Sequence, residues 1–382
     1  MSAKFDSIRP FDDSDLPNVL PKLFNNKEFI DSLVAFKFSS WPHFFKPILA
    51  FATRIYINKK IKKIKTLSSF QSLIGPYMDR MIDKTTESVT ISGLDDVDVS
   101  GACLFISNHR DIALDPAFVN WALHVKGQDT VRIAVGDNLL KKPWVSDLIR
   151  LNKCFIVERS ATDRRQKLAA AKLLSEYIEF TLHTEQQHVW IAQREGRAKD
   201  GRDITNPAII SMLTMNKPKS EDFSEYVNRL RIVPVSISYE FDPCDISKAK
   251  ELQQLELEGS YDKPDHEDMR SIVNGITGKK GRVHIHFSEV LSGEYENTKQ
   301  VAELIDQAVL SGYKPFATGP VAANMSAQLM TDLTDDNHKV AKHYLKSRLE
   351  KLNESEQTKL LNMYATAYLK QQEQLEQPCA VS

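Results

Sequence analysis

The stretch Cys103-Leu104-Phe105-Ile106-Ser107-Asn108-His109-Arg110-Asp111-Ile112-Ala113-Leu114-Asp115-Pro116 decides the fold, because it leads from a short apolar run into the start of a helix. The run 103–106 is typical of a buried strand. The pair Asp115-Pro116 is typical of a helix start, since aspartate is a favoured N-cap and proline suits the first helical position. His109 is therefore expected between a strand and a helix. In one continuous helix, His109 and Asp115 would lie about 240° apart, so they can meet only across a turn.

The same alternation of short apolar runs and longer amphipathic segments continues to about residue 291. We expect strands at 89–91, 103–106, 131–135, 155–157, 189–192, 232–238 and 283–287. We expect helices at 116–126, 137–149, 162–183 and 206–215. Strands that alternate with helices predict an α/β fold with a mostly parallel central sheet flanked by helices.

The regions on either side of this pattern are expected to be helical. We predict an N-terminal helical region at 1–87, the α/β domain at 88–298 and a C-terminal helical extension at 299–382. Pro42 and Pro47 should break or kink any helix that runs through them. The glutamine-rich tail 371–374 should fray.

The composition describes an ordinary globular protein and excludes several classes. Lys and Arg number 50 against 51 Asp and Glu, a formal charge of −1, so no global field favours nucleic acid and any anion site must be local. The four cysteines are far apart and form no zinc pattern, which argues against a zinc site and favours a reducing compartment. The acidic N-terminus is unlike a signal peptide, and no run of about 18 apolar residues predicts a spanning helix. We expect a cytoplasmic protein, or one that lies peripherally on the inner face of a membrane.

His109 and its neighbouring aspartates are the first candidate for chemistry. An imidazole can remove a hydroxyl proton near neutral pH, and it works best when a carboxylate accepts its other N–H. Asp111 and Asp115 are the local carboxylates. The alternative is a structural histidine beside a helix whose cap is Asp115, and the two readings of Asp115 are compatible.

Two later strand ends carry basic residues. Arg159 follows the strand at 155–157 and could cradle a phosphate near a helix that Ser160 or Thr162 caps. The alternative is a surface arginine paired with Glu158 or Asp163.

The second basic strand end follows the strand at 189–192. There Arg194, Glu195, Gly196 and Arg197 open a loop in which glycine lets a ligand approach the backbone and guanidinium groups match phosphate oxygens. The alternative is a solvated charged loop. A fourth feature, Val233-Pro234-Val235, is an apolar run whose proline suits a strand start or an edge.

The order of these four features resembles the glycerolipid acyltransferases, the glycerol-phosphate and lysophospholipid acyltransferase family. That family shows Asn-His-x4-Asp, then Phe-Ile-x-Arg, then Glu-Gly-x-Arg, then Val-Pro. The resemblance covers about residues 88–291 and is carried by Asn108, His109, Asp115, Phe155, Ile156, Arg159, Glu195, Gly196, Arg197, Val233, Pro234 and Val235.

The chain departs from the family pattern by one residue in three places. Five residues separate His109 from Asp115 instead of four, Arg159 comes one residue late, and Arg197 comes one residue early. A one-residue bulge would restore the pairing of His109 with Asp115. Otherwise Asp111 would orient the imidazole.

The resemblance implies an enzyme of phospholipid synthesis. Such an enzyme moves a fatty acyl group from its co-substrate, acyl-CoA or acyl-carrier protein, to the free hydroxyl of 1-acylglycerol-3-phosphate, without metal or bound cofactor. It implies that His109 is the general base, with Asp115 or Asp111 as its partner, and that donors near Glu195 and Gly196 hold the oxyanion. The acceptor phosphate would contact Arg159, Arg194 and Arg197.

Two other functions remain open. A soluble glycerol-3-phosphate acyltransferase is favoured by the long helical N-terminal region. A catalytically degenerate protein that binds lipid or acyl chains is favoured by the displaced Asp115.

The basic segment 56–65 bears on access to a lipid substrate. Ile57, Ile61 and Ile64 share one helical face, and five lysines lie mostly elsewhere, a pattern typical of an interfacial helix on anionic lipid. Trp41, Phe44 and Phe45 would add anchors at the interface. The alternative is a helix whose isoleucines face a core.

Overall fold

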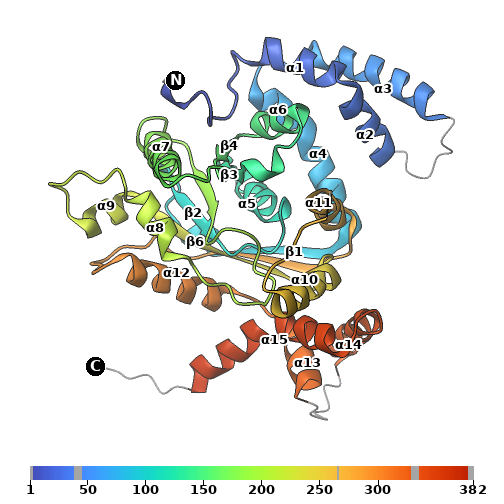
Figure 1. The fold of residues 1–382 in the computed structure, drawn as a ribbon, viewed down its shortest axis with the longest axis vertical. Coiled ribbons are helices and arrows are strands. Elements are labelled where there is room, and N and C mark those ends of the chain that lie inside the picture. The colour runs from blue at the N-terminus through green and yellow to red at the C-terminus, as the bar shows by residue number, and fades with distance from the viewer. Residues whose placement is uncertain (1–2, 38–44, 265, 328–334, 377–382) are drawn as a thin grey trace. The chain divides into compact units, whose positions relative to one another are not determined.

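The structure is a computed structural model, and it describes residues 3–37, 45–264, 266–327 and 335–376 (Figure 1). The chain forms two compact units, each built from segments that are not continuous in sequence. The smaller unit consists of Met1–Asp79 and Arg132–Tyr177, and the larger of Arg80–Val131 and Ile178–Ser382. The division of the chain into regions 1–87, 88–298 and 299–382 remains a prediction from the sequence.

The larger unit contains a mixed sheet in which most neighbours are parallel. Its strands follow the order β1-β7-β6-β2-β5. β1 is parallel to β7, and β2 is parallel to both β5 and β6, whereas β6 and β7 are antiparallel. The α/β class with a mostly parallel sheet is therefore confirmed. The bounds are β1 (Thr86–Ser92), β2 (Leu104–Ser107), β5 (Val189–Ala192), β6 (Ile232–Tyr239) and β7 (Gly281–Phe287).

β6 is completely buried, as β2 is, because all of its residues lie in the core. A strand covered on both faces is typically apolar, and Ser236 and Ser238 are the polar exceptions in β6. Pro234 lies at its third position, with a neighbouring strand on each side, and not at a strand start or an edge. The antiparallel register with β7 covers Val235 to Tyr239 and stops just before the proline, which therefore removes no donor from that ladder.

The helices of the larger unit include three that the sequence patterns did not predict, α9, α10 and α11. α9 has only seven residues, too few for an apolar helical period to be recognised. α5 starts two residues earlier than expected, at Leu114. The bounds are α5 (Leu114–Val125), α8 (Pro207–Leu213), α9 (Phe223–Arg229), α10 (Asp245–Glu258), α11 (Glu267–Thr277) and α12 (Thr298–Gly312), with a short 3-10 turn η3 (Leu94–Asp96).

The C-terminal part is helical, as expected, and has its own apolar cluster around Leu345 and Leu360. The expected fraying at 371–374 is wrong, because α15 continues through it and Gln371 donates hydrogen bonds to the carbonyls of Leu310 and Tyr313 at 2.8 and 2.6 Å. The bounds are α13 (Thr318–Ser326), α14 (Asp336–Leu349) and α15 (Glu354–Glu376).

The smaller unit combines N-terminal helices with the parallel pair β3 (Arg132–Gly136) and β4 (Cys154–Val157). The helix expected at 137–149 is divided into a 3-10 turn η4 and α6, because Pro143 begins a new helix. Pro47 likewise lies in the first turn of α3 and does not break it; Pro42 lies outside the described residues. The bounds are η1 (Ala3–Phe5), α1 (Leu16–Asn25), α2 (Lys27–Lys37), α3 (Lys46–Ile61), η4 (Asp137–Leu139) and α6 (Pro143–Leu151).

Two further helices, α4 (Leu67–Thr85) and α7 (Arg164–His183), contain a limit between the units, so each contributes residues to both. None of the helices in the described ranges is both long and apolar enough to cross a membrane.

Candidate active site

His109 and Asp115 meet across the turn between β2 and α5. β2 ends at Ser107 and α5 begins at Leu114, so residues 108–113 form the connection. The Nδ1 atom of His109 lies 2.9 Å from Oδ2 of Asp115. A carboxylate at this nitrogen fixes the imidazole with its proton on Nδ1, which leaves Nε2 to accept a proton.

The Asp115 carboxylate is completely buried and fully hydrogen-bonded. Oδ2 also accepts the backbone N–H groups of Arg110 and Asp111, at 2.6 and 2.9 Å. Oδ1 accepts the hydroxyl of Tyr239, from the last position of β6, at 2.7 Å. Four donors therefore converge on one carboxylate, three of them on Oδ2 and one on Oδ1.

Asp111 has a different place in the turn. Its Oδ1 accepts the N–H groups of Ala113 and Leu114, at 2.9 and 2.8 Å, so it caps the start of α5. Burial, and then the neighbouring charge of Asp115, raise the pKa of Asp111. The structure brings Asp115 to His109 and leaves Asp111 at the helix start.

The His109 ring is held from two sides and remains accessible. The Trp190 ring packs edge-on against it, with centroids 5.9 Å apart and an interplanar angle of 71°. The His109 carbonyl accepts the N–H of Ala198 at 2.8 Å, which ties the loop after β5 to the histidine block. Its side chain is 14% exposed.

The loop after β5 carries a buried arginine with an unused donor. Arg197 is 9% exposed, and its Nη2 donates to the Ser271 hydroxyl of α11 at a long 3.4 Å. Nη1 is buried and has no hydrogen-bond partner among the described residues. Gly196 has a φ of 72°, a conformation that favours glycine, and Glu195 beside it is exposed. Arg194, half-buried, completes the loop.

Arg159 lies in the smaller unit and is described there alone. It is exposed, two residues after β4, and its backbone N–H donates to Oδ1 of Asp137 at 3.1 Å. The expected cap of the next helix is wrong: Asp163, and neither Ser160 nor Thr162, accepts the N–H groups at the start of α7.

A buried ion pair that no sequence pattern indicates holds the backbone and side chains next to His109. Arg110 and Asp203 lie 2.6 Å apart, with side chains 6% and 9% exposed. The Asn108 amide also reaches Asp203, at 3.3 Å, and pairs with the backbone of Ile237. Lys248 donates to the Arg110 carbonyl at 2.6 Å. These partners lie about a hundred residues or more away, so no local pattern signals them.

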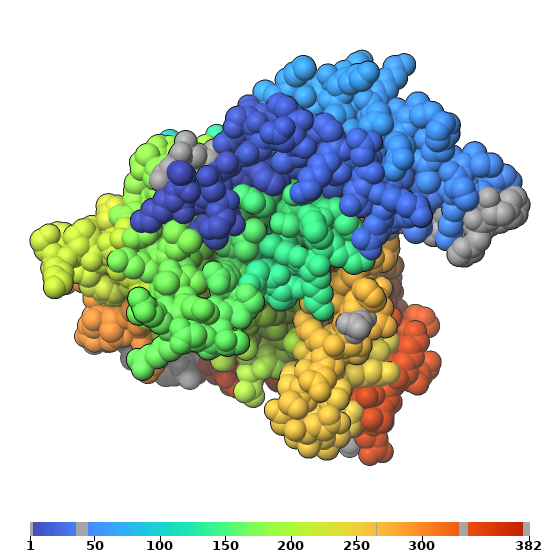
Figure 2. Space-filling model, turned by 45° about the horizontal axis from the view of Figure 1, so that its top comes forward, coloured from blue at the N-terminus to red at the C-terminus, as the bar shows by residue number. Residues whose placement is uncertain are grey.

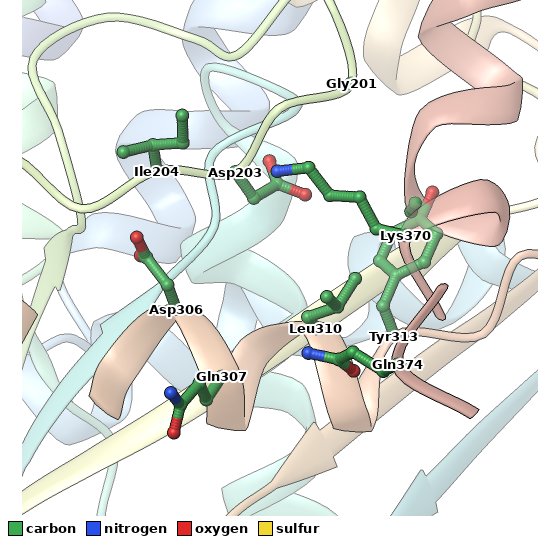
Figure 3. A pocket seen from close by; sticks show the side chains of 10 residues that line it. Gly201, Asp203, Ile204, Asp306, Gln307, Leu310, Tyr313, Lys370 and Gln374 are labelled. Carbon is green, nitrogen blue, oxygen red and sulfur yellow. The ribbon is translucent and has the colours of Figure 1, made fainter. Parts of the chain in front are cut away.

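A pocket of about 130 Å³ lies between the 201–204 segment, α12 and α15 (Figure 3). Gly201 closes one side with a φ of 78°, where an added Cβ would stand 2.5 Å from the Met363 carbonyl. Asp203 lines the pocket as well as pairing with Arg110, and Asp306, Tyr313 and Lys370 line it too. None of the site residues expected from the sequence lines this pocket.

A strand-end histidine paired with a buried aspartate, in a mostly parallel α/β fold, is an arrangement that can serve general-base chemistry. Residues 88–238 match the model of the acyltransferase family. This segment is therefore similar to the acyltransferase family, and the resemblance seen in the sequence is confirmed.

Two further comparisons complete this result. No curated protein matches the chain. Among solved structures, the chain is similar to the 1-acyl-sn-glycerophosphate (LPA) acyltransferase PlsC from Thermotoga maritima, with 13% identity and a TM-score of 0.37, over 76% of this chain and 92% of that one.

Proposed function

We propose that this protein transfers a fatty acyl group from acyl-CoA or acyl-carrier protein to the free hydroxyl of 1-acylglycerol-3-phosphate. The observation that carries the proposal is the His109–Asp115 pair, 2.9 Å apart, inside the segment that matches the acyltransferase family. A buried carboxylate behind an accessible imidazole is the arrangement that general-base catalysis needs.

The reaction would be a direct attack on the thioester. Nε2 of His109 removes the proton of the acceptor hydroxyl, and the oxygen forms a bond to the thioester carbonyl carbon. The C–S bond then breaks, and the departing thiolate takes the proton back from the imidazolium. Asp115 stabilises that imidazolium through Nδ1–H.

Arg197 is the residue best placed to hold an acceptor phosphate in the larger unit. Its Nη1 is buried without a partner, so a phosphate oxygen would satisfy a donor that is otherwise costly to bury. Arg194 belongs to the same loop and would assist, and backbone donors near Glu195 and Gly196 would hold the oxyanion. The role of Arg159 in phosphate binding rests on the sequence pattern.

An acceptor that resides in a bilayer requires a surface that meets the bilayer, and α3 offers one. The isoleucines expected to face lipid do not: Ile64 is buried, and Ile57 and Ile61 pack against the core of the smaller unit. Instead, Ile48, Phe51, Ile55 and Tyr56 are 65, 68, 56 and 57% exposed. The N-terminal helices are in open view in Figure 2, coloured blue.

We define these four residues as the α3 face. Positions 48, 51 and 55 recur at helical spacing, so the side chains share one side of the helix. The exposed lysines at 59, 60, 62, 63 and 65 follow directly, each worth about 1 kcal/mol near an anionic surface. Phe45 is half-buried before α3; Trp41 and Phe44 lie outside the described residues. The α3 face and its lysines support a peripheral place on anionic lipid.

The proposal is tested by thioester consumption. The wild-type chain and His109→Ala are incubated with acyl-CoA or acyl-carrier protein and with 1-acylglycerol-3-phosphate or glycerol 3-phosphate, and thiol release and product position are measured. We expect release with the lysophospholipid, and a loss of at least about a hundredfold in His109→Ala at an unchanged melting temperature. Preference for glycerol 3-phosphate would move the protein to the rival enzyme class. Binding of lipid with no turnover would make it a binding protein.

A further inference from the structure

Tyr239 joins the His109–Asp115 pair from a distant part of the chain. It is the last residue of β6, 8% exposed, and 124 residues after Asp115 in sequence. Its hydroxyl donates to Oδ1 of Asp115 at 2.7 Å. It does not contact His109 in any hydrogen bond of the described residues, so any effect on the base must pass through Asp115.

The donors around Asp115 are divided unequally between its two oxygens. Oδ2 accepts three groups, the His109 ring and two backbone N–H groups, whereas Tyr239 is the one donor that reaches Oδ1 within the described residues. Asp115 has no solvent exposure, so water cannot replace a lost donor at Oδ1. Without the tyrosine hydroxyl, an unsatisfied buried oxygen would remain beside a crowded one. Rotation of the carboxylate would relieve this imbalance and would move Oδ2 away from the imidazole.

The tyrosine itself is rigidly placed. Its backbone continues the β6 ladder opposite Val283 of β7. Its ring packs edge-on against Phe118 of α5, with centroids 5.9 Å apart and an angle of 61°. Burial, and then the charge of Asp115, raise the pKa of Tyr239 well above its ordinary value, so the hydroxyl stays a donor. A fixed strand thus presents a fixed O–H to a carboxylate on the first turn of α5.

We propose that Tyr239 is a positioning residue for acyl transfer: its hydroxyl locks the rotation of the Asp115 carboxylate and thereby the orientation of the His109 ring. The turn delivers the N–H groups of Arg110 and Asp111 to Oδ2, and the tyrosine at the end of β6 balances them at Oδ1. This inference rests on the proposed function of His109 as the base.

The test compares Tyr239→Phe with Tyr295→Phe. Tyr295 is a buried tyrosine of the same unit whose hydroxyl has no hydrogen-bond partner among the described residues, so its variant controls for loss of a buried hydroxyl. We expect Tyr239→Phe to lower kcat about tenfold or more, with little change in KM for the acceptor, because one hydrogen bond to a charged group is lost. Tyr295→Phe should retain full kcat.

Two readouts separate a positioning role from a merely structural one. In an Asp115→Asn background, Tyr239→Phe should cost little more, because the group through which it acts is already altered. The acidic limb of the kcat/KM profile should move to lower pH in Tyr239→Phe, because a displaced carboxylate stabilises the His109 imidazolium less. A fully additive loss in the double variant, or an unmoved limb, would overturn the proposal.

A readout without turnover distinguishes failure of this inference from failure of the proposed function. The hydrogen-bonded Nδ1 proton of His109 gives a proton NMR signal in wild type, identified by its absence in His109→Ala. We expect Tyr239→Phe to shift or broaden it and Tyr295→Phe to leave it unchanged. If wild type consumes no thioester but the signal moves, the function fails and the positioning role stands. If wild type is active and the signal stays, the positioning role fails.

Discussion

The two units differ in where they place charged and apolar side chains. The larger unit buries charge: Asp115, Lys248 and Lys280 are at most 1% exposed, and Arg110 is 6% exposed. The smaller unit exposes apolar surface, and Phe51, at 68%, is the most exposed residue of the α3 face. Buried charge costs free energy unless it is paired, and exposed apolar clusters mark contact with another surface. The comparison agrees with the two proposals made above, that the larger unit carries out acyl transfer and that the α3 face of the smaller unit contacts a lipid surface.

The largest effect is expected from a substitution at Asp115 in the larger unit. In Asp115→Asn the amide cannot accept the same set of donors, and His109 loses the charge that stabilises its protonated form; we expect a fall in kcat of about a thousandfold. Asp111→Asn keeps an oxygen that can cap α5, so its kcat should stay within about threefold. Steady-state kinetics of both variants decides the matter. Equal losses of kcat would mean that both aspartates assist His109.

The second prediction concerns the stability of the larger unit. Arg110→Met removes the partner of a buried carboxylate and leaves Asp203 uncompensated, so the free energy of unfolding should fall by about 3 kcal/mol. Adding Asp203→Leu should recover most of that loss, because neither charge then remains buried. Urea unfolding measures both variants.

The matched control for Arg110→Met is an exposed pair in the same unit. Lys299 and Glu303 of α12 lie 3.5 Å apart, with side chains 78 and 57% exposed. Lys299→Met should cost no more than about 0.5 kcal/mol. A similar cost for both arginine and lysine variants would show that the buried pair has no special weight.

Local chemistry allowed the strands and the turn at His109 to be predicted from the sequence. Each strand is a short apolar run, and each run expected between 89 and 287 corresponds to a strand. Asp115 was one of two possible partners for His109. The choice depended on how Asp111 uses its own oxygen, which is settled by backbone donors in the turn.

The remainder depends on tertiary contacts that carry no sequence pattern. Tyr239 reaches Asp115 only because β6 lies beside β2 in the sheet. The sequence pattern also predicts the wrong exposed side of α3, for a related reason. Isoleucines occur on both sides of this helix, and packing against α1 and α2 determines which are covered, here Ile57 and Ile61.

The smaller unit is tested through its exposed side. Replacing Phe51 and Ile55 by serine should weaken binding to anionic vesicles about tenfold or more, because two largely exposed apolar side chains no longer enter the lipid interface. Added salt should also weaken wild-type binding, since the lysines at the end of α3 and just after it are screened. Vesicle sedimentation measures both effects. Leu168→Ser is the control, because Leu168 is 60% exposed on α7 outside the α3 face. Equal binding by all variants would remove the α3 face as a lipid contact.

The last prediction concerns the buried charge of Lys280 in the larger unit. Lys280 is 0% exposed and donates to the Thr85 hydroxyl and the Gly278 carbonyl, both at 2.9 Å, and neither acceptor is charged. Burial lowers the pKa of Lys280 from 10.5 to about 8. Between these values the unfolded chain holds a proton that the folded chain has released, so stability should rise with pH from about 8 toward 10.5.

The slope that this one group adds is at most about 1.4 kcal/mol per pH unit. Urea unfolding of wild type and Lys280→Met from pH 7.5 to 9.5 isolates it, because all other groups titrate alike in both. The wild type should gain stability relative to the variant above pH 8 and run parallel to it below. Parallel curves over the whole range would mean that Lys280 stays charged when buried. Its two neutral acceptors would then suffice to hold an ammonium in the core, and burial of charge would be a weaker mark of function in this unit.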